Sequence, residues 1–313
     1  NVAVGAYCLD ANTTGDFNVA VGLNTLGGNT TANANTAVGN QAMLANTTGA
    51  FNAAFGAYAL DANTTADNNT AIGSEALTAN TTGASNTGCG SSSLSSNTTG
   101  QKNVAFGRHS MLDNTTGSFN VAVGQASLAN NTTANDNVAV GDDALFTNTT
   151  GFENVAVGSE ALRSNTTGLN NVGVGYRALD ACTTGSYNVG VGKDALGFVT
   201  TGTSNVSLGQ QTLQVVTTGN TNTGLGNYAG LDVTTGSNNT LLGSDAGRSA
   251  SPSGNITTGS NIVCLGNNSV TDLFCADTSI SSSDSRDKTD VTSFNIGLDW
   301  INALRPVTYR WDR

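Results

Sequence analysis

The sequence is dominated by a repeat whose period is seventeen residues. Each unit begins with Asn and carries Gly at its fifth position, first as Asn1 and Gly5, then as Asn18 and Gly22, then as Asn35 and Gly39. Fifteen units keep this phase without an insertion or a deletion. A chain that stacks equivalent coils cannot accept one coil longer than its neighbours, so the constant period predicts a solenoid.

The first five residues of a unit alternate between bulky and small side chains. Positions two and four are mostly branched or aromatic, as in Val19, Val21 and Phe55, whereas position three is Ala or Gly in almost every unit. This alternation predicts a short β-strand. We expect the bulky face to point into the coil, where position four meets the Leu or Met of position nine. The small face would then lie where a second backbone can approach closely.

Each unit would thus provide roughly three inward apolar side chains. Their burial stabilises a coil by about 1.5–3 kcal/mol each, which hardly exceeds the conformational entropy lost when one unit is ordered. Association would make up the difference. The sequence therefore predicts an all-β, elongated parallel β-solenoid, or β-roll, that assembles as a homotrimeric fibre through its position-three face. At ~4.8 Å per coil, such a rod is about 70 Å long.

The composition excludes several classes of partner. Charged residues make up 11% of the chain and the formal net charge is −11, so there is no basic stripe for nucleic acid or for an anionic membrane surface. No apolar run is long enough to predict membrane insertion. The five cysteines fall at unrelated positions of the repeat, which argues against a disulfide framework or a metal site and favours buried, unpaired thiols. The pattern predicts no cofactor.

Ten consecutive units carry Asn-Thr-Thr, which has the form of an N-glycosylation sequon. The asparagines are Asn12, Asn29, Asn46, Asn63, Asn80, Asn97, Asn114, Asn131, Asn148 and Asn165. Two interpretations are open: a glycan-clad filament, or a ladder of side-chain amides that hydrogen-bond from coil to coil. Later units place Cys182, Val199, Val216 and Val233 at this position. An exposed glycan site has no reason to become Val, so the sequence favours the ladder. The Asn1 and Gly5 positions are likewise expected to form structural ladders.

The remaining positions of the repeat suggest surface features. Paired threonines occur in ice-binding solenoids, but adjacent strand residues point to opposite faces, so a flat double rank is not expected. The Gly after the pair, as at Gly15, is expected to supply a turn with positive φ. The single histidine, His109, is expected to be a solvated turn residue. Ligand contacts are expected at turn residues that change from coil to coil: Tyr7, Tyr58, Glu75, Arg108, Glu160, Arg177 and Lys193.

The repeat is interrupted near its end. Six extra residues lie near 248–254, around Pro252, and after one more strand the composition changes. We therefore divide the chain into a solenoid shaft at 1–261, a final coil and transition at 262–282, and a separate segment at 283–313. Because the chain opens directly within the repeat array and without Met, we expect it to be a piece of a longer polypeptide.

The C-terminal segment carries two linked motifs. Ser283-Asp284, Arg286 and Lys288 are followed by the run Leu-Arg-Pro-Val-Thr-Tyr at 304–309. This pair resembles the start of the endosialidase-type intramolecular chaperone found on phage tail fibres and spikes. The repeats are similar to the Asn-Val-Ala-Val-Gly arrays of viral tail fibres and, more loosely, of trimeric autotransporter adhesin heads.

The resemblance implies a chaperone domain, incomplete at Arg313, that assembles three chains and then cuts itself off. On this resemblance Ser283 would be the nucleophile of a Ser-Lys dyad and Lys288 its base, with Asp284 and Arg286 supporting the motif. Cleavage would fall next to Ser283. A lysine that loses solvent on assembly gives up its proton more readily and can activate a hydroxyl.

The sequence therefore favours a structural fibre over an enzyme. The leading hypothesis is the homotrimeric shaft of a viral tail fibre or spike, located on the virion, whose turn residues contact a host-surface receptor or glycan. The alternative is an extracellular or cell-surface microbial filament, adhesin-like and possibly glycosylated. A third interpretation, the stalk of a glycan-cleaving spike, would place the enzyme upstream, because no cleft-forming insertion here carries paired carboxylates.

Overall fold

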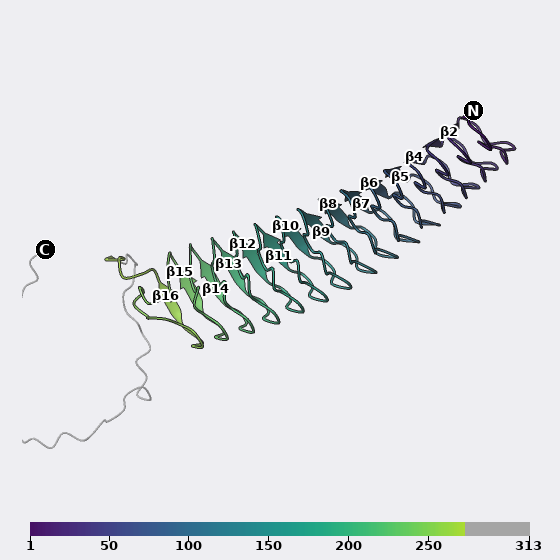
Figure 1. Cartoon of the computed structure of the whole chain (residues 1–313). Coiled ribbons are helices and arrows are strands. Elements are labelled where there is room, and N and C mark those ends of the chain that lie inside the picture. Colours follow the sequence, from purple (N-terminus) through teal and green to yellow (C-terminus); the bar gives the residue numbers. More distant parts are fainter. Residues whose placement is uncertain (273–313) are drawn as a thin grey trace, which may run out of the picture. The chain divides into compact units, whose positions relative to one another are not determined.

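A computed structural model describes residues 1–272 of the chain, and within them the repeat forms one parallel sheet of sixteen three-residue strands. The strands are β1 (Val2–Val4), β2 (Val19–Val21), β3 (Thr36–Val38), β4 (Ala53–Phe55), β5 (Thr70–Ile72), β6 (Thr87–Cys89), β7 (Val104–Phe106), β8 (Val121–Val123), β9 (Val138–Val140), β10 (Val155–Val157), β11 (Val172–Val174), β12 (Val189–Val191), β13 (Val206–Leu208), β14 (Thr223–Leu225), β15 (Thr240–Leu242) and β16 (Val263–Leu265). They follow one another in chain order along the stack (Figure 1). The predicted all-β parallel solenoid is confirmed.

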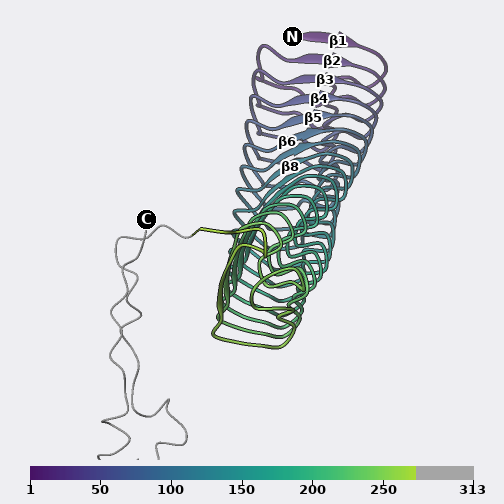
Figure 2. The same cartoon turned by 90° about the vertical axis from the view of Figure 1, so that its left-hand side faces the viewer.

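The register of the sheet reproduces the repeat. Each strand pairs with the equivalent residues of the next coil, so that Val138 of β9 lies opposite Val155 of β10. Figure 2 shows the coils stacked as narrow loops. Between β15 and β16 the offset grows from 17 to 23 residues, because Thr240 pairs with Val263. The six extra residues therefore loop out of the stack, and β16 rejoins the sheet in the same register. The solenoid and the residues directly after it form one unit, Asn1–Val270.

The orientation of the strands is opposite to the expectation from sequence. In β2 through β16 the middle residue is buried, and the first and third residues are half-buried or exposed. The bulky residues at positions two and four thus point outward, and the small position-three residues point into the coil. The prediction that position four meets position nine in the core is wrong, as is the prediction that the position-three face packs against another chain.

The physical reason is the narrowness of the coil. Leucine or methionine at position nine is fully buried from Leu26 through Leu213, and it packs against the inner side of the sheet. A Cβ added to Gly173 at position three would lie 3.3 Å from Cγ of Leu162 and 3.1 Å from the carbonyl oxygen of Ala178. Only a methyl group or a hydrogen fits there, so position three is small because it is inside.

The core rank at position nine adopts a conformation that leucine ordinarily avoids. From Leu26 to Leu213 the φ values lie between 50 and 57°, in the left-handed region, which costs about 1–2 kcal/mol for a residue with a Cβ. Burial of the side chain, at about 1.5–3 kcal/mol, offsets this cost. The array is therefore stable only while each leucine stays covered by the coils above and below it.

The last coils exchange the large and small positions of the core. Gly230 and Gly247 occupy position nine, while Leu241 replaces the small residue at position three. A Cβ on Gly230 would collide with Cδ1 of Leu241 and lie 2.6 Å from Cδ2 of Leu213, so the Leu241 side chain fills the space that a position-nine leucine would take. The volume of the core is thus maintained, but the side chain that fills it comes from a strand instead of from the turn.

Candidate functional site

The Asn1 position forms a buried ladder that closes each coil and joins it to the next. In Asn35 the backbone N–H donates to Oδ1 of Asn18 (2.9 Å), and the side-chain Nδ2 donates to the carbonyl oxygen of Gly49 (2.8 Å) within its own coil. The same pair of bonds recurs along the solenoid to Asn239. From Asn18 onward these side chains are buried. Each amide therefore satisfies a backbone donor that would otherwise be orphaned in the core. Where the coil carries Asn-Thr-Thr, the carbonyl acceptor is shared with the asparagine of that triplet, as Gly49 also accepts from Nδ2 of Asn46 (2.9 Å).

The asparagines of the Asn-Thr-Thr triplets form a second ladder. Nδ2 of Asn29 donates to Oδ1 of Asn12 (2.8 Å) and to the carbonyl oxygen of Ala32 (3.3 Å). The chain of amide contacts continues coil by coil to Asn165, whose Nδ2 donates to Oδ1 of Asn148 (2.8 Å). Oδ1 of Asn165 is buried without a partner, because the next coil has Cys182 at this position.

This geometry bears directly on the sequons. From Asn29 to Asn165 the side chains are fully buried, and Nδ2, the atom to which an N-linked glycan would be attached, uses its hydrogens in the ladder and the turn. The folded coil has no space for a sugar on that nitrogen. A glycan at these buried sites is therefore incompatible with the packed solenoid.

The two glycine ranks serve different purposes. The Gly5 rank has positive φ, for example +139° at Gly141, where an L side chain is strained. Gly15, Gly49 and Gly83 do not have positive φ, so the expectation of a left-handed turn there is wrong. A Cβ at Gly83 would instead lie 2.5 Å from Oδ1 of Asn80 and collide with the carbonyl oxygen of the next coil. This second rank is small because backbone and amide approach it closely.

The two threonines of each pair have different surroundings, as expected for adjacent residues. Oγ1 of Thr47 donates to the backbone oxygen of Thr64 (3.0 Å), and the same bond recurs along the rank. Thr48, its neighbour, is exposed. One threonine of each pair thus joins the coils and the other faces solvent.

The variable turn residues lie on the surface and form one small ionic cluster. Nε of Arg177 lies 2.8 Å from Oε2 of Glu160 and 3.9 Å from Oδ2 of Asp180. Arg177 and Asp180 also line a depression together with Asp194, Gly197, Phe198 and Gln214. Desolvation raises the pKa of Asp180, although the Arg177 guanidinium opposes that shift. The guanidinium is already shared by two carboxylates, so the cluster links coils rather than leaving a free charge for a ligand.

The other turn positions that sequence singled out are spread along the rod. Tyr7, Glu75 and Arg108 are exposed, while His109 is half-buried at φ 59°. No group of three His, Cys, Asp or Glu residues within 1–272 is placed to hold a metal ion. The same range contains no helix long and apolar enough to cross a membrane.

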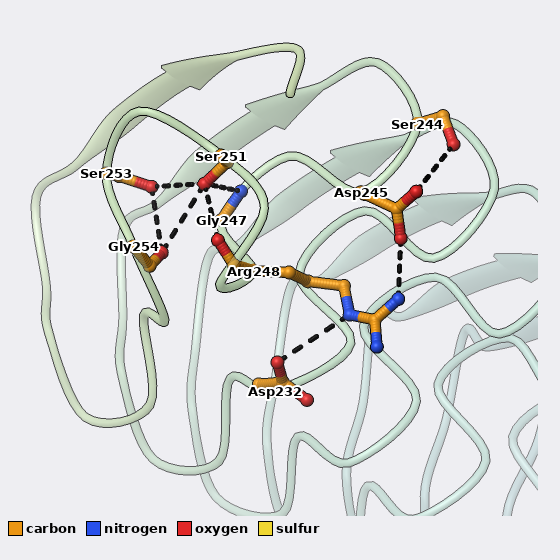
Figure 3. A network of polar contacts seen from close by, with 8 residues as sticks. All are labelled: Asp232, Ser244, Asp245, Gly247, Arg248, Ser251, Ser253 and Gly254. Carbon is orange, nitrogen blue, oxygen red and sulfur yellow. Dashed lines mark hydrogen bonds and ion pairs between the residues drawn. The ribbon is translucent and has the colours of Figure 1, made fainter. Parts of the chain in front are cut away.

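The six-residue insertion folds into a compact polar loop at the last coils (Figure 3). Oγ of Ser251, which is buried, donates to the carbonyl oxygen of Arg248 (2.8 Å) and accepts from the backbone N–H of Gly247 (3.1 Å). The Arg248 guanidinium bridges Asp245 and, at 3.6 Å, Asp232 of the preceding coil. These contacts hold the insertion against the stack, although Nε of Arg248 is buried without a hydrogen-bond partner.

The described cysteines are free, but they are not all buried. Cys8 and Cys89 are half-buried, which corrects the expectation of uniformly buried thiols, whereas Cys182 and Cys264 are buried. Burial raises the pKa of Cys182 to about 12. Desolvation also acts to raise the pKa of Cys264, but hydrogen bonds from Ser253 and Ser251 outweigh it and lower that pKa. The fifth cysteine, Cys275, lies outside the described residues.

One surface was missed by the sequence reasoning. The outward side chains at positions two and four of β1–β16, here called the outer ladder, run along the whole sheet, and Phe55, Phe106 and Leu208 are among the exposed ones. The signal was present in the alternation, but the alternation alone does not say which face is inside.

Ser283, Asp284, Arg286 and Lys288 all lie outside the described residues, so the geometry of the expected dyad is not part of the structure. A comparison with protein families is informative for the same segment: the family model described as chaperone of endosialidase matches residues 283–313. Comparisons with curated proteins and with solved structures found no match. The resemblance expected from the two linked motifs is thus confirmed for the last part of the chain. The chain joins a seventeen-residue-repeat β-solenoid to a C-terminal segment that matches the model of the chaperone-of-endosialidase family.

Proposed function

We propose that this chain is part of the trimeric shaft of a viral tail fibre or spike, which holds host-binding residues away from the particle. The observation that carries the proposal is the union, in one chain, of a long stack of identical coils with a segment of a chaperone family. A stack joined by ladders in every coil is a stiff spacer. The described part brings together no group of His, Cys, Asp and Glu residues that could hold a metal ion, and the solenoid itself is proposed to be structural.

In this proposal the chaperone segment drives assembly of three chains. Attachment to the host is assigned to the exposed turn residues, because they differ between coils while the ladders do not. Burial of the Asn-Thr-Thr amides from Asn29 to Asn165 disfavours the alternative of a filament clad in glycans at these triplets, since the sugars would have no space there.

The native mass of the assembled protein tests the proposal. Light scattering of the full-length polypeptide is expected to give three times the mass of the denatured chain. A native mass equal to that of one chain would contradict the trimeric shaft and leave a self-contained monomeric rod.

We further propose that maturation includes cleavage next to Ser283 by the Ser283–Lys288 dyad that the family resemblance implies. Replacing Ser283 with alanine in the full-length polypeptide removes the attacking hydroxyl, so the product is expected to be longer than the parent by the released segment. Ser282→Ala, one residue earlier in the same serine run, is the matched control and is expected to be processed normally. Mass spectrometry distinguishes the products. Equal lengths for parent and Ser283→Ala would remove the dyad assignment.

A further inference from the structure

The outer ladder is uncharged along its whole length and apolar at position four. Position four is Val, Phe, Ile, Leu or Cys in every one of the sixteen strands, and position two is Val, Thr or Ala. None of these side chains is charged. In the rest of the repeat, up to Arg248, the charged residues occupy positions six, seven, ten, eleven, sixteen and seventeen. The net negative charge is therefore kept off this one face of the sheet.

The ladder is also accessible. Phe55 is 42% exposed, Phe106 is 45% and Leu208 is 47%, although each is flanked by ladder neighbours in the coils above and below. A sheet face in contact with water normally carries polar or charged side chains. Exposed edge strands are likewise commonly protected against association by lysine or proline. This face has no such protection.

The size of the face indicates a macromolecular partner. Sixteen strands at ~4.8 Å and a band roughly 10 Å wide give an apolar strip on the order of 700 Å². This exceeds the largest patch of a typical monomer, about 300–600 Å². It approaches the ~800 Å² that each partner contributes to a stable protein interface.

We infer that the outer ladder is the surface through which copies of this chain pack, parallel and in register, around the axis of the fibre. The inference rests on the proposed trimer and names the face that forms it. A partner must match a strip that repeats once per coil along the whole rod, and a second copy of the chain does so by construction. The absence of charge on the strip lets acidic chains approach there with the least repulsion.

A pair of charged substitutions tests the assignment. Val123 and Val140 are adjacent ladder residues of β8 and β9, and Val123→Glu with Val140→Glu places two carboxylates on the strip. The matched control is Thr133→Glu with Thr150→Glu, which adds the same charges one coil apart at exposed positions away from the strands. Light scattering at equal concentration is expected to show loss of the trimer in the first variant and a native mass unchanged from the parent in the control.

A second readout does not depend on disrupting the fold. In a background with Cys8, Cys89 and Cys275 replaced by serine, Val123→Cys is expected to yield linked dimers with a short bis-maleimide, because one accessible thiol per chain can join only two chains, whereas Thr133→Cys is expected to remain single. A parent that is monomeric would overturn the proposed shaft. A trimeric parent whose outer-ladder variants stay trimeric, or that cross-links only through Thr133→Cys, would overturn the assignment of the face while leaving the trimer intact.

Discussion

Replacing Asn137 with alanine is expected to lower the local free energy of unfolding by about 2–4 kcal/mol. Oδ1 of Asn137 accepts from the backbone N–H of Asn154 (3.0 Å), and its Nδ2 donates to the carbonyl oxygen of Gly151 (2.9 Å). Alanine would leave the Asn154 N–H buried without a partner, at a cost of about 1–3 kcal/mol, and would add a small cavity. The Gly151 carbonyl would lose one of its two donors and keep Nδ2 of Asn148 (2.8 Å).

Native-state hydrogen exchange measures this loss as the decrease in the opening free energy of the Asn154 amide relative to the parent protein. A local measurement is appropriate because long repeat arrays do not unfold in a single two-state step. Asn135→Ala is the matched control. Oδ1 of Asn135 also accepts a backbone N–H, that of Ser118 (2.7 Å), but in an exposed setting where water can replace it, so the expected cost is under ~1 kcal/mol. Equal effects of the two substitutions would mean that burial does not set the strength of the ladder.

Replacing Gly141 with alanine is expected to separate two coils. Gly141 has φ +139°, and a Cβ there would lie 2.5 Å from both the carbonyl carbon and the oxygen of Gly158 in the next coil. The backbone strain costs about 1–3 kcal/mol, and the overlap with a rigid backbone adds to it, so a total of ~3 kcal/mol or more is expected. Amide protection across β9 and β10 should fall sharply in hydrogen-exchange mass spectrometry.

Gly151→Ala, in the same coil, is the control for this effect. Gly151 does not have positive φ, and it belongs to the Gly15 rank, in which Ala32, Ala66 and Ala134 occur naturally. An ideal Cβ at Gly151 would also collide with the carbonyl oxygen of Gly168, but the natural alanines of this rank show that the stack accommodates a methyl group by a small shift. Protection of β9 and β10 is expected to stay near that of the parent. A comparable loss of protection in both variants would show that close packing, rather than the positive φ, decides which glycines are required.

The seventeen-residue period was sufficient to predict the fold class, because a constant spacing allows only equivalent coils. It was not sufficient to orient the strands. A period of two is symmetric, so the bulky and the small face are equally good candidates for the inside until the width of the coil is known. The deciding residue is position three: Gly173 has no space for more than a methyl group beside Leu162, and that contact is visible only in three dimensions.

At other positions, too, the sequence predicted some features and not others. The change from asparagine to Cys182 and then to valine pointed to a buried position, and the Asn29 side chain is indeed buried within a ladder. The leucines at position nine gave no sign of their left-handed backbone, because leucine rarely adopts it and burial overrides the preference. The exchange of Leu241 for the position-nine side chain near Gly230 also depends on contact across coils, which linear spacing does not reveal.

The register of the sheet has a consequence for how such rods can change in evolution. Because every strand from β1 to β14 meets its successor at the same offset, a gain or loss of seventeen residues adds or removes one complete coil and disturbs no neighbouring contact. A gain of any other number has to leave the stack as a loop, as the six residues before β16 do. Unequal recombination between in-phase units could therefore change the length of the rod in steps of about 4.8 Å, while the contacts between the remaining coils stay the same.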